Sequence, residues 1–240
     1  MNILLAYYSR SGHTHALALA LAEALRARGH GVTLERVQAV EERSRWRLVP
    51  GLLSTLPVLP LFFISARFRR WWLQRYPQPE LPIRSLAWPD VSAFDRVCVG
   101  TPKWLYISYP IATWLRTVRG LGGKPVGAFA SFCGPPLKTF ELEMLFAPLA
   151  HRIARAGASL AACLAVSSHY HEFFVFHEME YVFRALSRLC FGRPLRAFTL
   201  GTPWANAQIA QFCDCLLAQD VTHPASSESA GDGSPDRTCG

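Results

Sequence analysis

A short polar loop near the start of the chain gathers side chains that could bind an anion. The loop interrupts an apolar N-terminal stretch and consists of Ser9, Arg10, Ser11, Gly12, His13 and Thr14. The apolar run 3–7 before it predicts a buried strand, and the Ala- and Leu-rich run 16–25 after it predicts a helix. Unpaired amides and a positive dipole at that helix start would let a phosphate accept several hydrogen bonds at once. The hydroxyl groups add donors, and Gly12 lets the backbone come close to a ligand.

This order of residues resembles the FMN phosphate loop of the flavodoxin-like family, which also follows the first strand directly. The loop carries neither a Walker lysine after a glycine nor a GxGxxG sequence, so nucleoside triphosphates and dinucleotides are not its first choice of ligand. The alternative is an ordinary helix start that Ser11 or Thr14 caps and to which nothing binds.

A second loop follows the apolar run 94–100. Its sequence Gly-Thr-Pro-Lys-Trp is similar to the loop after the third strand of flavodoxins, where an aromatic ring lies against the isoalloxazine. The resemblance implies cofactor contacts from Pro102, Lys103, Trp104, Leu105 and Tyr106, with the ring of Trp104 or Tyr106 stacked on the flavin. Lys103 replaces the usual threonine, and a cation there would favour the anionic reduced flavin. The alternative is a surface turn in which Thr101 and Pro102 begin a helix.

A third loop comes after the expected strand 124–131. It holds Ser131, Phe132, Cys133 and Gly134, at the position where the family has its third flavin-contacting loop. The match is looser here, because family members often carry glycines and an acid where this chain has a cysteine and two prolines. Cys133 could be a redox thiol, although a lone cysteine at a strand end is more often structural.

The elements that position these loops alternate strand and helix along the chain. Five apolar segments, 3–7, 32–37, 94–100, 124–131 and 159–166, predict an α/β fold with a doubly wound, five-stranded parallel sheet. The flavodoxin-like strand order 2-1-3-4-5 would bring the first and second loops together at its switch point. We expect a helix over 137–156 with a break near Pro148, and a final helix over 204–217 capped at Thr202. The prediction is one domain, 1–218, with insertions at 41–89 and 168–199 and a disordered tail, 219–240.

The first insertion has an unusual composition. Its run 48–66 carries no charge, and arginines and tryptophans flank it on both sides, with seven arginines and no acid between Arg43 and Arg75. Four prolines and glycines within the run oppose a single spanning helix. A peripheral membrane contact through 46–75 and a lid or homodimer contact are equally good interpretations. The segment offers few polar side chains that reach base edges, so we expect no nucleic-acid binding.

The second insertion is rich in aromatic and histidine residues. Its histidine spacing matches no common zinc site, so we expect no metal. Its apolar positions predict a helix face that packs on the first insertion or on another subunit, and they are Phe173, Phe176, Val182, Phe183, Leu186 and Leu189.

Composition favours a cytoplasmic protein. The seven cysteines are odd in number and lack a CxxC pair, which is typical of reduced thiols, and the N-terminus shows no export signal. The leading hypothesis is an FMN-dependent oxidoreductase that reduces a hydrophobic acceptor such as a quinone with NAD(P)H. Flavodoxins are typically small and acidic, whereas this chain is larger and has a formal net charge of +8, so a single-electron carrier for a protein partner is the second hypothesis. A flavin-free binding protein or scaffold is the third.

Overall fold

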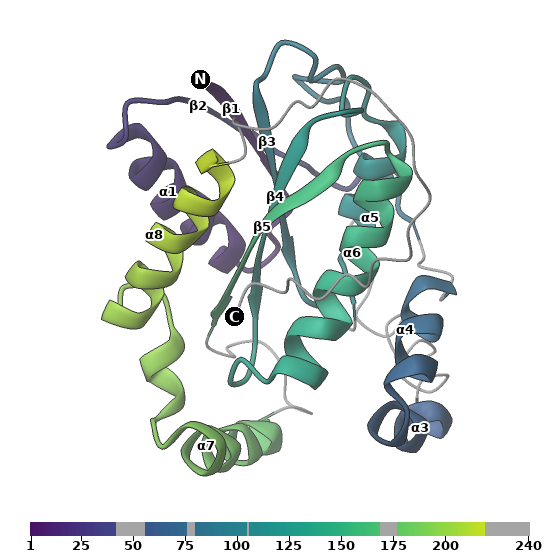
Figure 1. The fold of residues 1–240 in the computed structure, drawn as a ribbon, viewed down its shortest axis with the longest axis vertical. Coiled ribbons are helices and arrows are strands. Elements are labelled where there is room, and N and C mark those ends of the chain that lie inside the picture. Colours follow the sequence, from purple (N-terminus) through teal and green to yellow (C-terminus); the bar gives the residue numbers. More distant parts are fainter. Residues whose placement is uncertain (42–55, 76–79, 105, 169–176, 219–240) are drawn as a thin grey trace, which may run out of the picture.

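The fold is a five-stranded parallel sheet between two layers of helices (Figure 1). The computed structural model describes residues 1–41, 56–75, 80–104, 106–168 and 177–218. The strands are β1 (Asn2–Tyr7), β2 (Gly31–Arg36), β3 (Arg96–Pro102), β4 (Pro125–Phe132) and β5 (Ser159–Ser167). Their order, β2-β1-β3-β4-β5, with every pair parallel, confirms the doubly wound flavodoxin-like fold.

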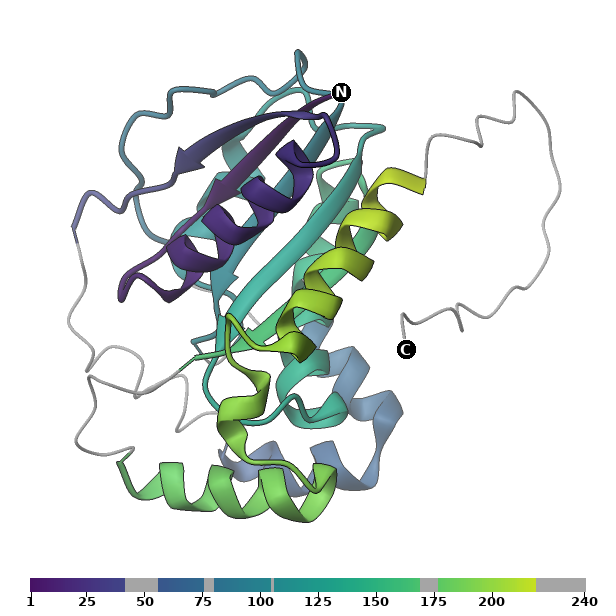
Figure 2. The same ribbon diagram turned by 90° about the vertical axis from the view of Figure 1, so that its left-hand side faces the viewer.

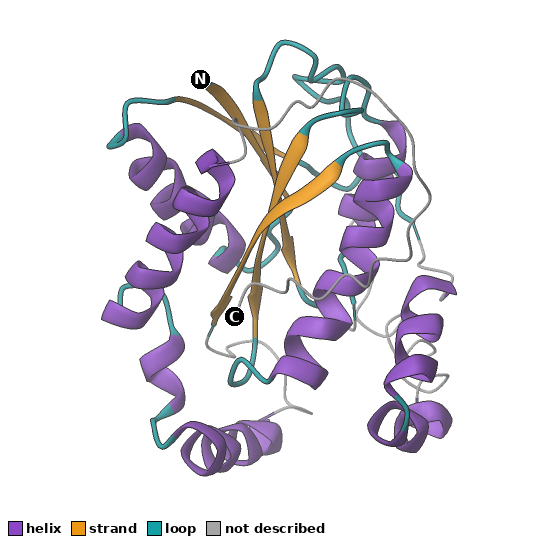
Figure 3. Cartoon of the chain, in the orientation of Figure 1, coloured by secondary structure: helices purple, strands orange, loops and turns teal. Residues whose placement is uncertain are grey.

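Two pairs of helices cover the two faces of the sheet. On one face lie α1 (His13–Arg26) and α8 (Pro203–Leu217), and on the other lie α5 (Tyr109–Thr117) and α6 (Glu143–Arg155) (Figures 1 and 3). The residues of β1 alternate between the two cores, with Leu4 and Ala6 in one and Ile3 and Leu5 in the other. Burial on both faces is the reason that this strand is a continuous apolar run.

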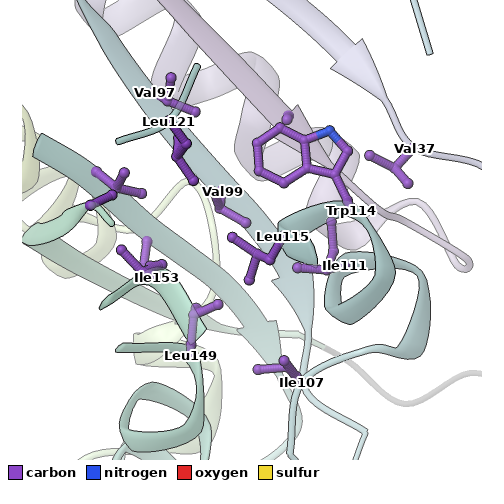
Figure 4. Close-up of a cluster of buried hydrophobic side chains, with 14 of the residues drawn as sticks. Val37, Val97, Val99, Ile107, Ile111, Trp114, Leu115, Leu121, Leu149 and Ile153 are labelled. Atoms are coloured by element: carbon purple, nitrogen blue, oxygen red, sulfur yellow. The ribbon is translucent and has the colours of Figure 1, made fainter. Parts of the chain in front are cut away.

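The core under α5 and α6 is built around Trp114, which is fully buried (Figure 4). Ile111 and Leu115 on the same helix and Leu149 and Ile153 on α6 pack against β3 and β4. At Gly100 of β3 a side chain has no room, because an added Cβ would lie 2.2 Å from the ring of Phe129. Phe129 belongs to the core on the other face of the sheet, under α1 and α8.

Most expected elements appear within a residue or two of their predicted bounds, but the helix around Pro148 differs. We expected a break near this proline, and α6 instead continues through it. The helical geometry changes earlier, where a π-helical turn, η3 (Lys138–Leu142), precedes α6. Pro148 is buried between the fully buried Leu145 and Leu149, and this packing offsets the lost backbone hydrogen bond.

The described parts of the two insertions contain helices. The first forms η2 (Leu56–Val58), α3 (Leu59–Ile64) and α4 (Ala66–Arg75), and the second forms α7 (His177–Phe191) and η5 (Leu195–Phe198). Figures 1 and 2 place α3, α4 and α7 beyond the carboxyl ends of the strands. Within the described residues, none of the helices has the length and apolar character needed to cross a membrane.

The face predicted for the second insertion is only partly packed. Phe183 and Leu186 of α7 are half-buried, whereas Val182 and Leu189 are exposed, so this face is not fully covered within one copy of the chain. Packing on another subunit stays a prediction. Phe173, Phe176 and the tail 219–240 lie outside the described residues.

Candidate functional site

The strand order brings the three predicted loops to one edge of the sheet. Tyr7 at the end of β1 is paired in register with Gly100 of β3, and Pro102 of β3 is paired with Ser131 of β4. The backbone N–H of Lys103 donates to the carbonyl of Ser131 over 2.9 Å. The hydroxyl oxygens of Thr14 and Ser131 lie 2.7 Å apart. Loops that are more than a hundred residues apart in the sequence are thus joined directly.

The first loop leads into an open helix start. Gly12 has a φ of 90° and occupies the N-cap position of α1, where it offers no side chain to cap the helix, although the Ser9 hydroxyl accepts from the first-turn N–H of His15. The ordinary start capped by Ser11 or Thr14 is therefore absent. An added Cβ at Gly12 would meet no atom within 4 Å, so the loop at this point is not packed against other parts of the described chain. The arrangement suits an anion, because the first-turn amides point out of the helix end.

The hydroxyl groups of this loop differ in their surroundings. Ser9 and Thr14 are buried, while Ser11 is exposed. The Ser9 oxygen accepts from the backbone N–H of His15 over 3.2 Å, so its own hydrogen can still be donated. In the Thr14–Ser131 pair one hydroxyl donates to the other, and the hydrogen of the accepting group likewise remains for a ligand.

Two further side chains support this loop, and motif analysis missed both of them. Arg36 at the end of β2 donates to the carbonyl of Ser9 over 3.0 Å, and its position follows from its register with Tyr7. The Tyr7 hydroxyl lies 2.6 Å from Nδ1 of His15, and the two rings are stacked. Burial raises the pKa of Tyr7, and the nearby positive charge of Arg36 opposes that shift. Tyr7 therefore stays a neutral hydroxyl beside the loop.

The two candidate stacking rings have different surroundings. Trp104 is half-buried and meets Tyr8 and Tyr109 edge to face, with ring centroids 5.6 and 5.1 Å away. Tyr106 is buried, and its hydroxyl accepts from Nε1 of Trp72 on α4 over 3.1 Å. Of the two, only Trp104 therefore keeps exposed surface that a flat ligand could cover. Leu105 lies outside the described residues.

Lys103 is not an isolated cation. Its ammonium group forms an ion pair with Glu141 of the π-helical turn, and the two side chains are only 10% and 4% exposed. Burial raises the pKa of Glu141, and Lys103 lowers it. The pair adds little net charge to this end of the sheet, so the expected effect of Lys103 on a reduced flavin would be weakened. The pairing of Glu141 with Lys103 could not be predicted from the sequence, because the two residues are 38 positions apart.

The third loop is largely bonded within the protein. The carbonyl of Phe132 accepts from the backbone N–H of Ser168 over 2.7 Å, and that of Gly134 accepts from the hydroxyl of Ser167 over 2.6 Å. The Cys133 sulfur is half-buried and lies 3.7 Å from the Ser168 hydroxyl. An added Cβ at Gly134 would lie 3.2 Å from the ring of Phe183, so α7 covers this loop. The loop lies beside the other two, with fewer groups left for a ligand.

Other kinds of site are not seen in the described parts of the chain. No group of three or more histidine, cysteine, aspartate or glutamate side chains there could hold a metal ion. The six cysteines in those parts are free thiols. The stretch 169–172, which holds two histidines and a glutamate of the second insertion, lies outside the described residues.

Solved structures similar to this chain include flavodoxins and flavoproteins. A flavoprotein in complex with FMN from Lactobacillus acidophilus NCFM is 17% identical, with a TM-score of 0.45 over 68% of this chain and 92% of that chain. Oxidised flavodoxin 2 from Bacillus cereus is 15% identical, with a TM-score of 0.47 over 90% of this chain and 97% of that chain. Two-electron reduced Megasphaera elsdenii flavodoxin is 16% identical, with a TM-score of 0.40 over 69% of this chain and 85% of that chain. No family model and no curated protein matches the sequence.

Proposed function

We propose that this chain binds FMN at the carboxyl end of its sheet and works as an oxidoreductase. The observation that carries the proposal is the loop 9–14, which joins β1 to a helix start with a positive-φ glycine at its N-cap and contains buried hydroxyl groups. FMN ends in a phosphate dianion, and the loop offers amides, hydroxyl hydrogens and the positive end of the dipole of α1.

The ring of the cofactor would be held by the second and third loops. Trp104 offers a partly exposed aromatic face, and the loop 131–134 lies beside it through the bond from the Lys103 N–H to the Ser131 carbonyl. Bound FMN supplies the electron or hydride transfer. The protein binds the phosphate, orients the ring and keeps Lys103 neutralised by Glu141, so it places no net charge there through that pair.

NAD(P)H is the proposed electron donor, and a hydrophobic molecule such as a quinone is the proposed acceptor. Helices α3, α4 and α7 lie at the same end of the sheet as the loops and carry many apolar and aromatic side chains (Figure 2). Such surroundings favour an apolar acceptor over a charged one. A flavodoxin-type electron carrier for a protein partner remains the alternative function.

The first experiment is the visible absorption spectrum of the purified protein, followed by denaturation and identification of the released chromophore. We expect a flavin spectrum and released FMN. A colourless protein that also fails to take up added FMN would refute the proposal and leave the flavin-free scaffold.

A second experiment isolates the phosphate loop. Ser11→Glu places a carboxylate beside the proposed phosphate, while an acid at a helix N-terminus favours the fold itself. We expect this variant to lose at least about tenfold in FMN affinity, since charged contacts of this kind typically contribute more than 1.4 kcal/mol. Riboflavin lacks the phosphate, so its affinity should not change. Equal losses for both ligands would show that the phosphate does not lie at this loop.

The two redox functions are separated by steady-state oxidation of NAD(P)H in the presence of a water-soluble quinone. Turnover that depends on both substrates supports the oxidoreductase. Two resolved one-electron steps on reductive titration, without NAD(P)H oxidation, would instead support the electron carrier.

A further inference from the structure

The outer surface of the first insertion combines basic and apolar side chains. We call it the insertion face, and it consists of Leu61, Ile64, Arg67, Arg70, Trp71 and Arg75, all of which are exposed. Ile64 is 80% exposed and Trp71 is 47% exposed, which is unusual for residues of this size and polarity. The Arg75 guanidinium lies over the Trp71 ring, 5.3 Å from its centroid.

The opposite side of these helices is firmly docked on the domain. Phe62 and Leu73 are buried in a small core with Tyr106 of the second loop and Met144 of α6. Arg69 donates to Glu143 of α6 over 2.8 Å. The exposed side chains are therefore displayed by a packed structure, and they do not result from helices that lack a place on the protein.

The charge of this segment has one sign. The sequence carries no aspartate or glutamate from 43 to 79, and three arginines of the insertion face project among its apolar side chains. Arginines bind anionic lipid head groups, and tryptophan rings with aliphatic side chains favour the boundary between head groups and acyl chains. A binder of nucleic acid would instead need polar side chains where Leu61 and Ile64 lie.

The second insertion repeats this combination at the same end of the molecule. On α7, Leu189 is 84% exposed and Tyr181 and Val182 are also exposed, together with Arg184 and Arg188. The first turn of α7 carries Glu178 and Glu180, and no acidic residue follows from 181 to 213. Figures 1 and 2 both place α7 and the pair α3–α4 beyond the carboxyl ends of the strands. Two separate insertions thus present basic and apolar residues at one end.

We propose that this end of the protein docks on the surface of an anionic phospholipid bilayer, with the insertion face as the main contact and α7 as a second one. Ile64 and Trp71 enter the interfacial layer, and the arginines pair with lipid phosphates. Docking requires no flavin, so it goes beyond the proposed oxidoreductase function. It would turn the candidate site toward the membrane, where apolar acceptors are dissolved.

Sedimentation of the full chain with lipid vesicles tests this proposal. Vesicles of phosphatidylcholine are compared with vesicles that also contain phosphatidylglycerol, at low and high salt. We expect binding only to the anionic vesicles, with weaker binding at high salt because the charges are screened. The apoprotein should bind as well as the FMN-loaded protein, which separates this proposal from the flavin proposal.

Two pairs of variants locate the contact. Arg67→Glu/Arg70→Glu should lower vesicle affinity by at least about thirtyfold, since the loss of each basic residue near the surface costs about a factor of five and each new carboxylate is repelled by the lipid phosphates. The matched control, Arg119→Glu/Arg155→Glu, makes the same charge change at exposed positions after α5 and at the end of α6, which lead back to the amino ends of the strands. Ile64→Glu should also weaken binding, with Leu19→Glu on α1 as its exposed apolar control.

The proposal would be overturned by equal affinity for neutral and anionic vesicles, or by equal losses of affinity in the insertion-face and control variants. It would also be overturned if the chain bound no vesicles and captured an acidic polypeptide instead. Circular dichroism of each variant establishes that it is folded before its affinity is compared.

Discussion

The hydroxyl oxygens of Thr14 and Ser131 lie 2.7 Å apart, although Thr14 begins the helix that follows β1, Ser131 lies in β4, and these two strands are not neighbours in the sheet. The contact therefore spans the width of β3. Both residues are buried, and each lies in a loop that we propose to contact FMN. A single hydrogen bond thus couples the phosphate loop to the loop beside the proposed ring.

Breaking this bond from both sides should destabilise the protein by less than the sum of the two single changes. Thr14→Val preserves the shape of the side chain but leaves the Ser131 hydroxyl buried without this partner, at a cost of about 1 to 3 kcal/mol. Ser131→Ala should cost a similar amount. The double variant should be more stable than the sum of the two predicts, with a coupling of about 1 kcal/mol in urea unfolding. Additive losses would show that the two hydroxyls do not interact.

A matched pair of glycines separates folding from ligand binding. Gly12 and Gly29 have φ angles of 90° and 84°, and a Cβ at either would meet no atom within 4 Å. Alanine at each position should therefore cost a similar backbone strain, about 1 to 2 kcal/mol in the free energy of unfolding. Gly12 precedes the first turn of α1 and Gly29 follows the end of this helix. Only Gly12→Ala should therefore also lower the affinity for FMN. Equal FMN affinities in the two variants, measured by flavin fluorescence, would argue against the phosphate loop.

The ion pair between Lys103 and Glu141 predicts a pH-dependent stability. Burial raises the pKa of Glu141 above its ordinary value of 4.5, so the native state holds this proton more tightly than the unfolded chain. The stability that Glu141 contributes is therefore fully present below that value and is lost as the pH rises through the raised pKa. Lys103→Met removes the charge that lowers this pKa, so the loss should extend to higher pH.

The expected result at neutral pH is a loss of about 3 to 5 kcal/mol for Lys103→Met, because a buried charge loses its partner. Part of the loss should be recovered on acidification, when Glu141 takes up a proton. The measurement is the free energy of unfolding between about pH 4 and pH 8. Lys103→Met/Glu141→Gln is the control, since it should show no recovery attributable to this carboxyl. A single variant whose stability does not depend on pH would contradict the prediction.

The sheet could be predicted from the sequence because each central strand is buried on both faces. Leu4 and Leu5 of β1 enter opposite cores, which leaves an uninterrupted apolar run in the sequence. Thr202 was recognisable as a cap, and its hydroxyl accepts from the backbone N–H of Ala205 over 3.3 Å. Both signals are local. The strand order came from the resemblance of two loops and was confirmed by the pairing.

The parts that could not be predicted depend on contacts between distant segments. Glu141 carries no local sign that it neutralises Lys103, because a π-helical turn places it there. The sequence suggests Tyr106 as a stacking ring, but in the structure its hydroxyl accepts a hydrogen bond from Trp72 of α4. The course of α6 through Pro148 likewise depends on the burial of Leu145 and Leu149. Each outcome was decided by tertiary packing.

The docking of α3 and α4 should depend on Arg69. This side chain is nearly buried, and it donates to the Glu143 carboxylate and to the carbonyl of Phe62. Arg69→Met keeps the aliphatic stem but removes both hydrogen bonds, so we expect a loss of about 1.5 to 3 kcal/mol. Hydrogen exchange should rise in 59–75 and stay unchanged in β1 and β3, because the loss is local. Arg70→Met on the exposed side of the same helix is the control and should leave exchange unaltered. If both variants exchange like the unchanged protein, Arg69 does not hold the insertion in place.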